Sequence, residues 1–281
     1  MKEMVYDFNN IRIETSFKSF SQLRLLLEFL QKNNLYKINI PCKNSLKKYF
    51  LIDSIKITRE EFPNIDIIPH FSILHEFRRN RNNTQKAFIE FLHLVKNHGI
   101  SNVLLVSGSR KRATLDSVSS LNLMKENPLF LNSNFSLGVA FNPYLPSDEF
   151  DDEIIRLKEK IQSGIVSSIW IQFGTNSTVL KRRIEVLKNI ISLTIKNNSK
   201  ISNISLFGSI LIPSKQFLAR FKYRPWKGVY CSNEFLESVD LANKLVKELL
   251  KTYMKYNICP IIETSVSNDD QLESLKMLLE I

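Results

Sequence analysis

Three polar side chains stand at the ends of apolar runs, where they could meet a ligand. Glu14 closes the run IRIE, His70 follows IIP, and Gln172 follows SIWI. A buried carboxylate without a partner costs on the order of several kcal/mol, so Glu14 is expected to reach an open site. An imidazole can hold a cofactor or substrate, and a side-chain amide matches the donor and acceptor edge of a heterocycle. Together these residue types favour a site for a heterocyclic small molecule.

Each of the three residues also has a structural interpretation, which the sequence leaves open. Glu14 could form an ion pair with Arg12 or a neighbouring lysine at the rim of the fold. His70 could be a core histidine bonded to a backbone carbonyl, and nothing supports pairing it with His75 around a metal ion. A glutamine that ends an otherwise apolar strand is harder to explain by packing, so a ligand contact is favoured for Gln172.

The elements that must position these residues are short apolar runs separated by amphipathic stretches. Eight runs have the length of buried strands, at residues 11–15, 36–40, 65–71, 102–106, 136–141, 168–173, 203–208 and 259–264. Helical patterns lie between them at residues 20–31, 84–98, 150–162, 180–195 and 235–256, with Thr84 as an expected N-cap and Gly99 as a stop. This alternation predicts a (β/α)8 TIM barrel in one domain, residues 1–281. A doubly wound sheet is the alternative, but no GxGxxG follows the first strand.

In a barrel, the loops that follow the strands gather at one end and form the active site. That geometry adds further candidates at strand ends, namely Thr15, Asn39, Ser107, Gly108, Ser109, Asn142 and Thr264. Two basic loops, HEFRRNRNN at residues 75–83 and SRKRA at residues 109–113, are expected on the same face. They could hold a pyrophosphate, a polyanionic tail or a nucleic-acid backbone, or simply be solvated. Phe77 is the one aromatic residue between these charges, so nucleic acid is not favoured there.

Composition limits the class of protein. Lys and Arg outnumber Asp and Glu by 39 to 28, an excess that a biased composition also explains. The three cysteines are far apart and lack CxxC spacing, which argues for a reducing compartment and against a disulfide framework or a zinc site. No leader and no apolar stretch of about 20 residues is visible, so the expectation is a cytoplasmic protein without a membrane span.

The order of these segments resembles the methylenetetrahydrofolate reductase family. The likeness rests on an acid in the first strand, a Pro-His pair in the third, NHGI before LLVSG, and LKEKIQSG before an IWIQF strand. It runs from about Ile11 to Thr264 and is divergent. Members of that family are flavin-containing (β/α)8 barrels. The resemblance therefore implies FAD as cofactor, NADH or NADPH as reductant, and a methylene-tetrahydrofolate-type substrate of one-carbon metabolism and methionine biosynthesis.

The resemblance also implies roles for individual residues. Glu14 matches the family's first-strand glutamate, the acid that opens the imidazolidine ring of the substrate to an iminium, and burial should raise its pKa. Gln172 matches the glutamine that contacts the pterin, and Phe217 lies near the aromatic residue that stacks on the folate. The residues implied at the flavin are His70 beside the ring, Lys160 near the phosphates, and Phe141 at the exit of the fifth strand.

The chain departs from the family where the flavin would bind. Ser107-Gly108-Ser109 replaces an Arg-Gly-Asp turn, and the turn after Phe141 lacks the His-Pro-Glu signature. Arg110, Lys111 and Arg112 could replace the missing arginine in holding pyrophosphate. Two alternatives therefore stay open: a barrel without catalysis that binds a protein partner or regulates one, and a reductase with different cofactor use or substrate. A homo-oligomer is compatible with both.

Overall fold

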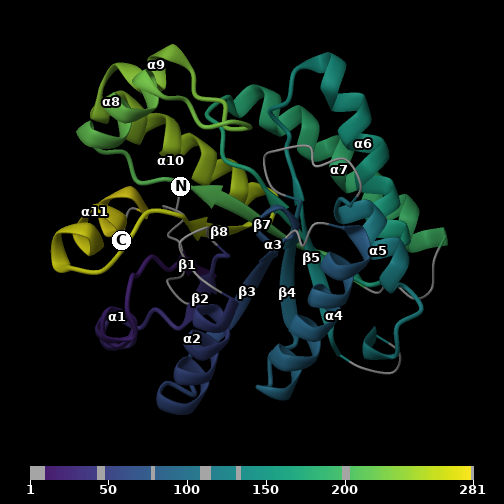
Figure 1. The fold of residues 1–281 in the computed structure, drawn as a ribbon. Coiled ribbons are helices and arrows are strands. Elements are labelled where there is room, and N and C mark those ends of the chain that lie inside the picture. The colour runs from purple at the N-terminus through teal and green to yellow at the C-terminus, as the bar shows by residue number, and fades with distance from the viewer. Residues whose placement is uncertain are drawn as a thin grey trace.

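The computed structural model describes residues 10–42, 48–76, 80–107, 115–130, 134–197 and 203–279. Eight parallel strands close into a barrel in chain order, with helices around the outside (Figure 1). This confirms the predicted (β/α)8 barrel. The strands are β1 Arg12–Glu14, β2 Lys37–Ile40, β3 Asp66–Ser72, β4 Asn102–Val106, β5 Ser136–Phe141, β6 Val166–Ile171, β7 Ser205–Ile210 and β8 Cys259–Ile262.

Helices follow the strands and pack on the outer face of the barrel. They are α1 Phe20–Lys32, α2 Lys48–Glu61, α3 Ile73–Glu76, α4 Arg81–Asn97, α5 Ser117–Met124, α6 Ser147–Gln162, α7 Ser177–Asn197, α8 Lys215–Tyr223, α9 Asn233–Glu237, α10 Val239–Lys255 and α11 Asp269–Leu279. Short polar side chains begin several of them, because their oxygens accept the free N–H groups of the first turn. Ser19 caps α1, and Ser214 caps α8.

Two sequence predictions about helices were wrong in detail. Asn80, not Thr84, is the N-cap of α4, and Thr84 is fully buried with its hydroxyl bonded to the Asn80 carbonyl oxygen. The expected single helix at residues 235–256 is broken at Ser238, whose extended backbone ends α9 and whose hydroxyl caps α10. Gly99 does end α4, with a φ of +73° that favours glycine.

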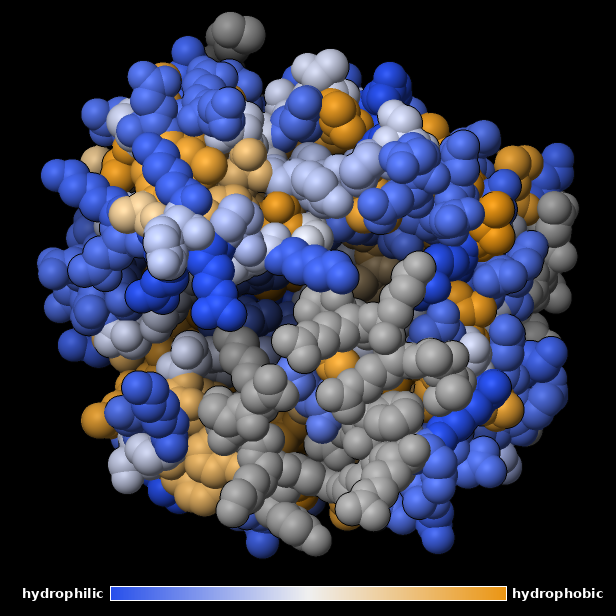
Figure 2. Space-filling view, turned by 45° about the horizontal axis from the view of Figure 1, so that its top comes forward, coloured by the Kyte–Doolittle hydropathy of each residue, from blue (hydrophilic) through white to orange (hydrophobic). Residues whose placement is uncertain are grey.

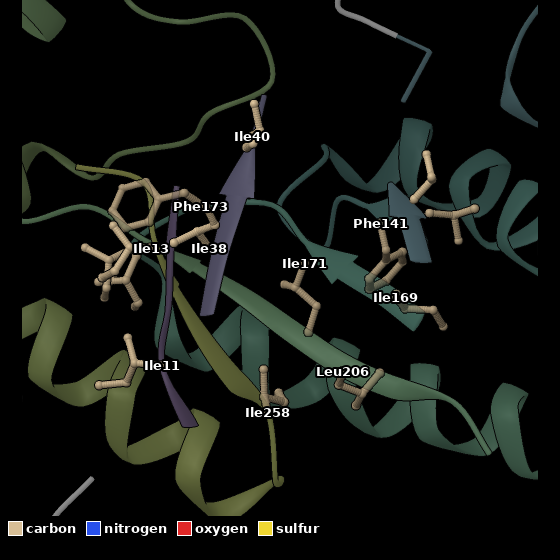
Figure 3. Packing of buried hydrophobic residues seen from close by; sticks show 14 of the residues in the cluster. Ile11, Ile13, Ile38, Ile40, Phe141, Ile169, Ile171, Phe173, Leu206 and Ile258 are labelled. Atoms are coloured by element: carbon tan, nitrogen blue, oxygen red, sulfur yellow. The ribbon is translucent and has the colours of Figure 1, made fainter. Parts of the chain in front are cut away.

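Alternation along each strand separates two apolar layers. Ile13, Ile38 and Phe141 point outward into the main core between the strands and the helices (Figure 3). A smaller inner cluster contains Ile68, Leu104, Trp170 and Ile261, with Val106 and Phe207 packed against it. Because successive side chains of a strand face opposite sides, the residues between the outward positions line the inside of the barrel. Three buried polar residues, Arg12, Asn39 and His70, lie among these inward positions.

Candidate active site at the barrel mouth

A buried arginine organises the polar interior of the barrel. Arg12 on β1 is 3% exposed and forms an ion pair with Asp66 on β3, with 2.5 Å between Nη1 and Oδ2. Its Nε donates to Asn39 Oδ1 at 2.8 Å and its Nη2 to the Ile38 carbonyl oxygen at 2.6 Å. A buried charge is tolerated when it is paired and hydrogen-bonded in this way. Arg12 therefore pairs with Asp66, and the ion pair considered between Arg12 and Glu14 is not formed.

Asn39 connects this arginine to His70. Its side-chain nitrogen lies 3.1 Å from His70 Nε2, and both residues are buried. An arginine side chain only donates hydrogen bonds, so Asn39 must present its oxygen to Arg12 and its NH₂ group to His70. His70 Nε2 therefore accepts, which makes the imidazole neutral with its proton on Nδ1. The structure thus bonds His70 Nε2 to a side-chain amide inside the barrel.

Trp170 on β6 forms an aromatic floor beside His70. The two rings meet edge to face with centroids 6.0 Å apart, and Phe207 stacks on the indole at 4.5 Å. The indole N–H donates to Ser168 Oγ at 2.9 Å. Gly138 leaves room for this ring, because a Cβ at that position would come within 2.4 Å of Trp170 Nε1. The inside of the barrel is thus filled below the mouth, and a ligand would sit above this floor.

Three half-buried polar side chains lie at the carboxyl ends of the strands above this floor. Glu14 is the next inward position after Arg12, and Gln172 is the next after Trp170. The main-chain N–H of Gln172 donates to the Phe141 carbonyl oxygen at 2.9 Å, which continues the β5–β6 ladder. Glu263 follows the inward Ile261 on β8. The structure therefore brings Glu14, His70 and Gln172 to the same end of the barrel.

Glu263 is a site residue that the sequence reasoning missed. Arg12 and Ile13 pair with Ile261 and Ile262, so extending this register by one residue sets Glu14 beside Glu263. Ser209 Oγ donates to Glu263 Oε1 at 2.6 Å, and this hydrogen bond favours the ionised carboxylate. The sequence CPIIET could have revealed this residue, because side chains alternate along a strand and Glu263 therefore faces the barrel interior like Ile261. The register thus sets two carboxylate residues on neighbouring strands at the mouth.

Phe141 and Lys160 lie behind the barrel wall, away from Glu14 and His70. The Phe141 ring is fully buried in the outer core, 6.2 Å from the Phe150 ring of α6. The Lys160 ammonium donates to the Ala140 carbonyl oxygen at 2.8 Å and lies 3.9 Å from Glu153 Oε1. Burial lowers the pKa of Lys160, while Glu153 opposes that shift. Both side chains therefore have packing or ion-pairing roles in the structure, unlike the flavin contacts expected of them.

Phe217 belongs to an aromatic cluster in the segment between β7 and α10. Its ring lies 5.4 Å from Trp226, 5.8 Å from Phe221 and 6.3 Å from Phe235. The segment is attached to the exits of two strands. Asn142 Nδ2 donates to the Gly228 carbonyl oxygen at 2.9 Å, and the Thr175 N–H donates to the Tyr230 carbonyl oxygen at 3.0 Å. Residues 224–232 form a turn and one parallel bridge between Tyr230 and Gly174.

Several other strand-end candidates hold the local structure. Ser107 Oγ accepts from the Ser117 N–H at 2.9 Å, at the start of α5. The Thr15 hydroxyl donates to the Asn39 carbonyl oxygen, and Thr264 Oγ1 accepts from the Ile212 N–H. The expected phosphate-binding residues Gly108, Ser109, Arg110 and Arg112 lie outside the described residues.

Neither a metal-binding cluster nor a membrane-spanning helix occurs in the described part of the chain. It contains no group of three or more His, Cys, Asp or Glu side chains able to hold a metal ion. Among the helices described, none is long and apolar enough to cross a membrane. A cavity of about 750 Å³ opens at the amino-terminal ends of β7 and β8, lined in part by Lys37, Ser205 and Cys259. It lies at the opposite end of the barrel from Glu14 and Gln172, where barrels of this class do not place catalysis.

The fold and the polar mouth together define a (β/α)8 barrel with a candidate site at the carboxyl ends of its strands. No family model matches the chain. No curated protein matches its sequence.

Solved structures of other proteins share the fold. An uncharacterized protein from Clostridium thermocellum that binds two copies of 5-methyl-5,6,7,8-tetrahydrofolic acid is 13% identical, with a TM-score of 0.57 over 96% of this chain and 93% of that one. An aldo-keto reductase from Klebsiella pneumoniae in complex with NADPH is 10% identical, with a TM-score of 0.55 over 97% and 86%. An endo-laminarinase from Formosa is 10% identical, with a TM-score of 0.56 over 97% and 82%. At these identities the likeness shows the fold alone.

Proposed function

We propose that this barrel is a divergent methylenetetrahydrofolate reductase-like oxidoreductase that binds a reduced folate at its mouth. The observation that carries the proposal is the arrival of Glu14, His70 and Gln172 at one end of the barrel from three different strands. The resemblance of the sequence had assigned these residues to substrate and cofactor. A folate-binding barrel among the structures of similar fold adds support.

The chemistry of the mouth suits a pterin. Gln172 offers both a donor and an acceptor to the edge of the heterocycle, and its side-chain amide has no hydrogen-bond partner within the described part of the chain. The stacked rings of Trp170 and Phe207 close the site from below with an apolar surface. A flat ring system with a polar edge fits between these two features.

Glu14 would supply the proton of the reaction. Protonation of the ring nitrogen breaks its bond to the methylene carbon, which leaves a cationic iminium and a neutral amine. The carboxylate of Glu263, in register beside Glu14, would stabilise that cation electrostatically. A nicotinamide nucleotide, if bound, would supply the hydride that turns the methylene carbon into the methyl group.

The described residues do not fit the family's flavin site. Lys160 and Phe141, which the resemblance placed at the flavin, are committed to the interface between β5 and α6. His70 Nε2 is committed to Asn39. The proposed reaction therefore involves no flavin.

A binding barrel without turnover is the second candidate. It is favoured by the structural use of Ser107, Phe141 and Lys160, three positions where the family has flavin contacts. Such a protein would bind a reduced folate and leave it unchanged.

Single-turnover assays separate the two candidates. The protein is mixed with methylenetetrahydrofolate and NADPH or NADH, with and without added FAD, and the methyl product is quantified. We expect product with wild type and its loss with Glu14→Gln, while Glu159→Gln on the exposed face of α6 behaves as wild type. Tight folate binding with no product under any condition would favour the binding barrel. Product formation that Glu14→Gln leaves intact would contradict the assigned acid.

A further inference from the structure

The segment from Lys215 to Tyr230, which we call the basic excursion, concentrates positive charge on one part of the surface. It comprises α8 and the following turn and contains no acidic residue. It supplies five of the eleven net positive charges of the chain, whereas an even spread would give a stretch of this length well under one. Its five cations are Lys215, Arg220, Lys222, Arg224 and Lys227. The charge of this segment is therefore more than a background of basic composition.

These cations are available to a ligand. All five are exposed, and none of them forms an ion pair with a residue of the described ranges. Elsewhere on the surface, by contrast, Arg24 pairs with Glu61 at 2.6 Å and Lys276 with Glu273 at 2.8 Å. Unpaired cations gathered on one short segment raise the local concentration of anions and attract polyanions in particular.

Exposed aromatic rings are interleaved with the charges. Tyr223 is 92% exposed, Trp226 43% and Tyr230 37%. The Trp226 ring is held in place, because its edge packs against Phe217 at 5.4 Å and Phe221 at 6.1 Å. In Figure 2, the side of the molecule that carries α8 and α9 shows hydrophobic side chains flanked by strongly hydrophilic ones. This interleaving is what the basic loops at residues 75–83 and 109–113 lack.

Hydrogen bonds to the exits of β5 and β6 hold the backbone of the excursion in place. They attach the excursion to Asn142 through Gly228 and to the Thr175 N–H through Tyr230. Directly after the excursion, the Ser232 N–H donates to Thr175 Oγ1 at 2.7 Å. Gly228, with a φ of +82°, makes the turn that returns the chain toward β6. A surface that is ordered before binding loses less conformational entropy when a flexible ligand settles on it.

We propose that the basic excursion binds single-stranded nucleic acid, with phosphates on the five cations and bases stacked on Tyr223 and Trp226. Sequence-tolerant proteins of this kind combine a cationic track with aromatic platforms. Five cations exceed what the pyrophosphate of a dinucleotide would require. A membrane surface fits less well, because Leu218 and Phe221, the apolar side of α8, are buried in the protein.

The test measures fluorescence anisotropy of a labelled oligodeoxythymidylate of about 12 nucleotides as salt is varied. We expect binding at low salt, with a slope of log K against log salt near −3.5 if all five cations engage phosphates. Arg220→Gln with Arg224→Gln should make the slope shallower by about 1.4. Lys181→Gln with Arg182→Gln removes the same charge from exposed positions of α7 and should leave the slope unchanged.

Stacking is tested separately from charge. Tyr223→Leu and Trp226→Leu keep every cation, and each should lower the affinity for the oligonucleotide about tenfold. Binding should quench tryptophan fluorescence in wild type, and Trp226→Leu should abolish the quenching, because Trp170 is buried in the barrel. The proposal is overturned by no binding at low salt, by binding that both aromatic variants retain, or by equal affinity for duplex DNA, heparin or phosphatidylserine vesicles. These outcomes are independent of whether the barrel binds a folate.

Discussion

The side-chain nitrogen of Asn39 lies 3.1 Å from His70 Nε2, and this contact fixes the chemistry of the histidine. Arg12 sets the orientation of the amide because it can only donate to the Asn39 oxygen, 2.8 Å away. The histidine consequently keeps its Nε2 unprotonated. A buried cation on β1 thus determines the tautomer of a ring on β3 through one asparagine on β2.

This relationship predicts the result of an isosteric substitution. Asn39→Asp keeps an oxygen for Arg12 and replaces the NH₂ group with a second oxygen, so His70 Nε2 should become protonated. Nitrogen-15 NMR of the imidazole, with His70→Asn for assignment, reports which nitrogen carries the proton. A protonated Nε2 in the wild-type protein at neutral pH would contradict the orientation of the amide.

Removing the asparagine side chain altogether should be costly. Asn39→Leu leaves Arg12 Nε and His70 Nε2 without this partner inside the barrel, and each loss costs about 1–3 kcal/mol. Urea denaturation should show a fall of that order or more in the free energy of unfolding. A variant as stable as wild type would mean that the interior readily rearranges.

The sequence predicts those features of the fold that depend on local patterns and misses those that depend on how the strands pair. Buried parallel strands need continuous apolar runs, so all eight strands could be located from their composition. The positions of Glu14 and Gln172 at strand ends predicted that both lie at the barrel mouth. The Arg12–Asn39–His70 chain depends on the register of three strands, which no local pattern contains. Phe141 and Lys160 were expected at the flavin, but they lie between the strands and the outer helices. A family resemblance does not indicate whether a residue faces the inside or the outside of the barrel.

A buried hydroxyl offers a stability test. Tyr144 Oη is the one buried side-chain nitrogen or oxygen without a hydrogen-bond partner among the described residues. Burial raises its pKa, with smaller contributions from Tyr253 and Cys231. Because an unpaired buried hydroxyl costs about 1–3 kcal/mol, Tyr144→Phe should raise the free energy of unfolding by about 1 kcal/mol.

The matched control for that substitution is Tyr253→Phe. The Tyr253 hydroxyl donates to the Ser209 carbonyl oxygen at 3.1 Å, so its removal should destabilise the protein by about 1 kcal/mol. Urea denaturation of both variants checks the pair. Equal effects of the same sign would contradict the assignment of one hydroxyl as bonded and the other as unbonded.

The stability of the fold should fall in alkali because of a buried thiol. Burial raises the pKa of Cys231 from 9.0 to about 12. Between these values the unfolded chain releases a proton that the folded chain retains, so the free energy of unfolding decreases as pH rises from about 9 toward 12. Denaturation across this range should show a shallower decrease in Cys231→Ala than in wild type. An unchanged slope would exclude the thiol as a contributor.

The second carboxylate at the mouth can be tested with the proposed reaction. Glu263→Gln retains a partner for Ser209 and removes the negative charge beside Glu14. We expect product formation to slow by about tenfold or more while folate affinity changes little, because the charge acts on the iminium rather than on the bound substrate. Rapid-quench measurement of the methyl product checks the rate. Unchanged turnover would remove Glu263 from the mechanism.

We propose that the mouth of this barrel binds a reduced folate through Gln172. Isothermal titration with 5-methyltetrahydrofolate tests it directly, because this ligand needs neither reductant nor flavin. We expect stoichiometric binding to wild type, a loss of about tenfold or more in affinity with Gln172→Leu, and no loss with Gln162→Leu on the exposed end of α6. Absence of binding to wild type, or equal affinity of the Gln172→Leu variant, would contradict it.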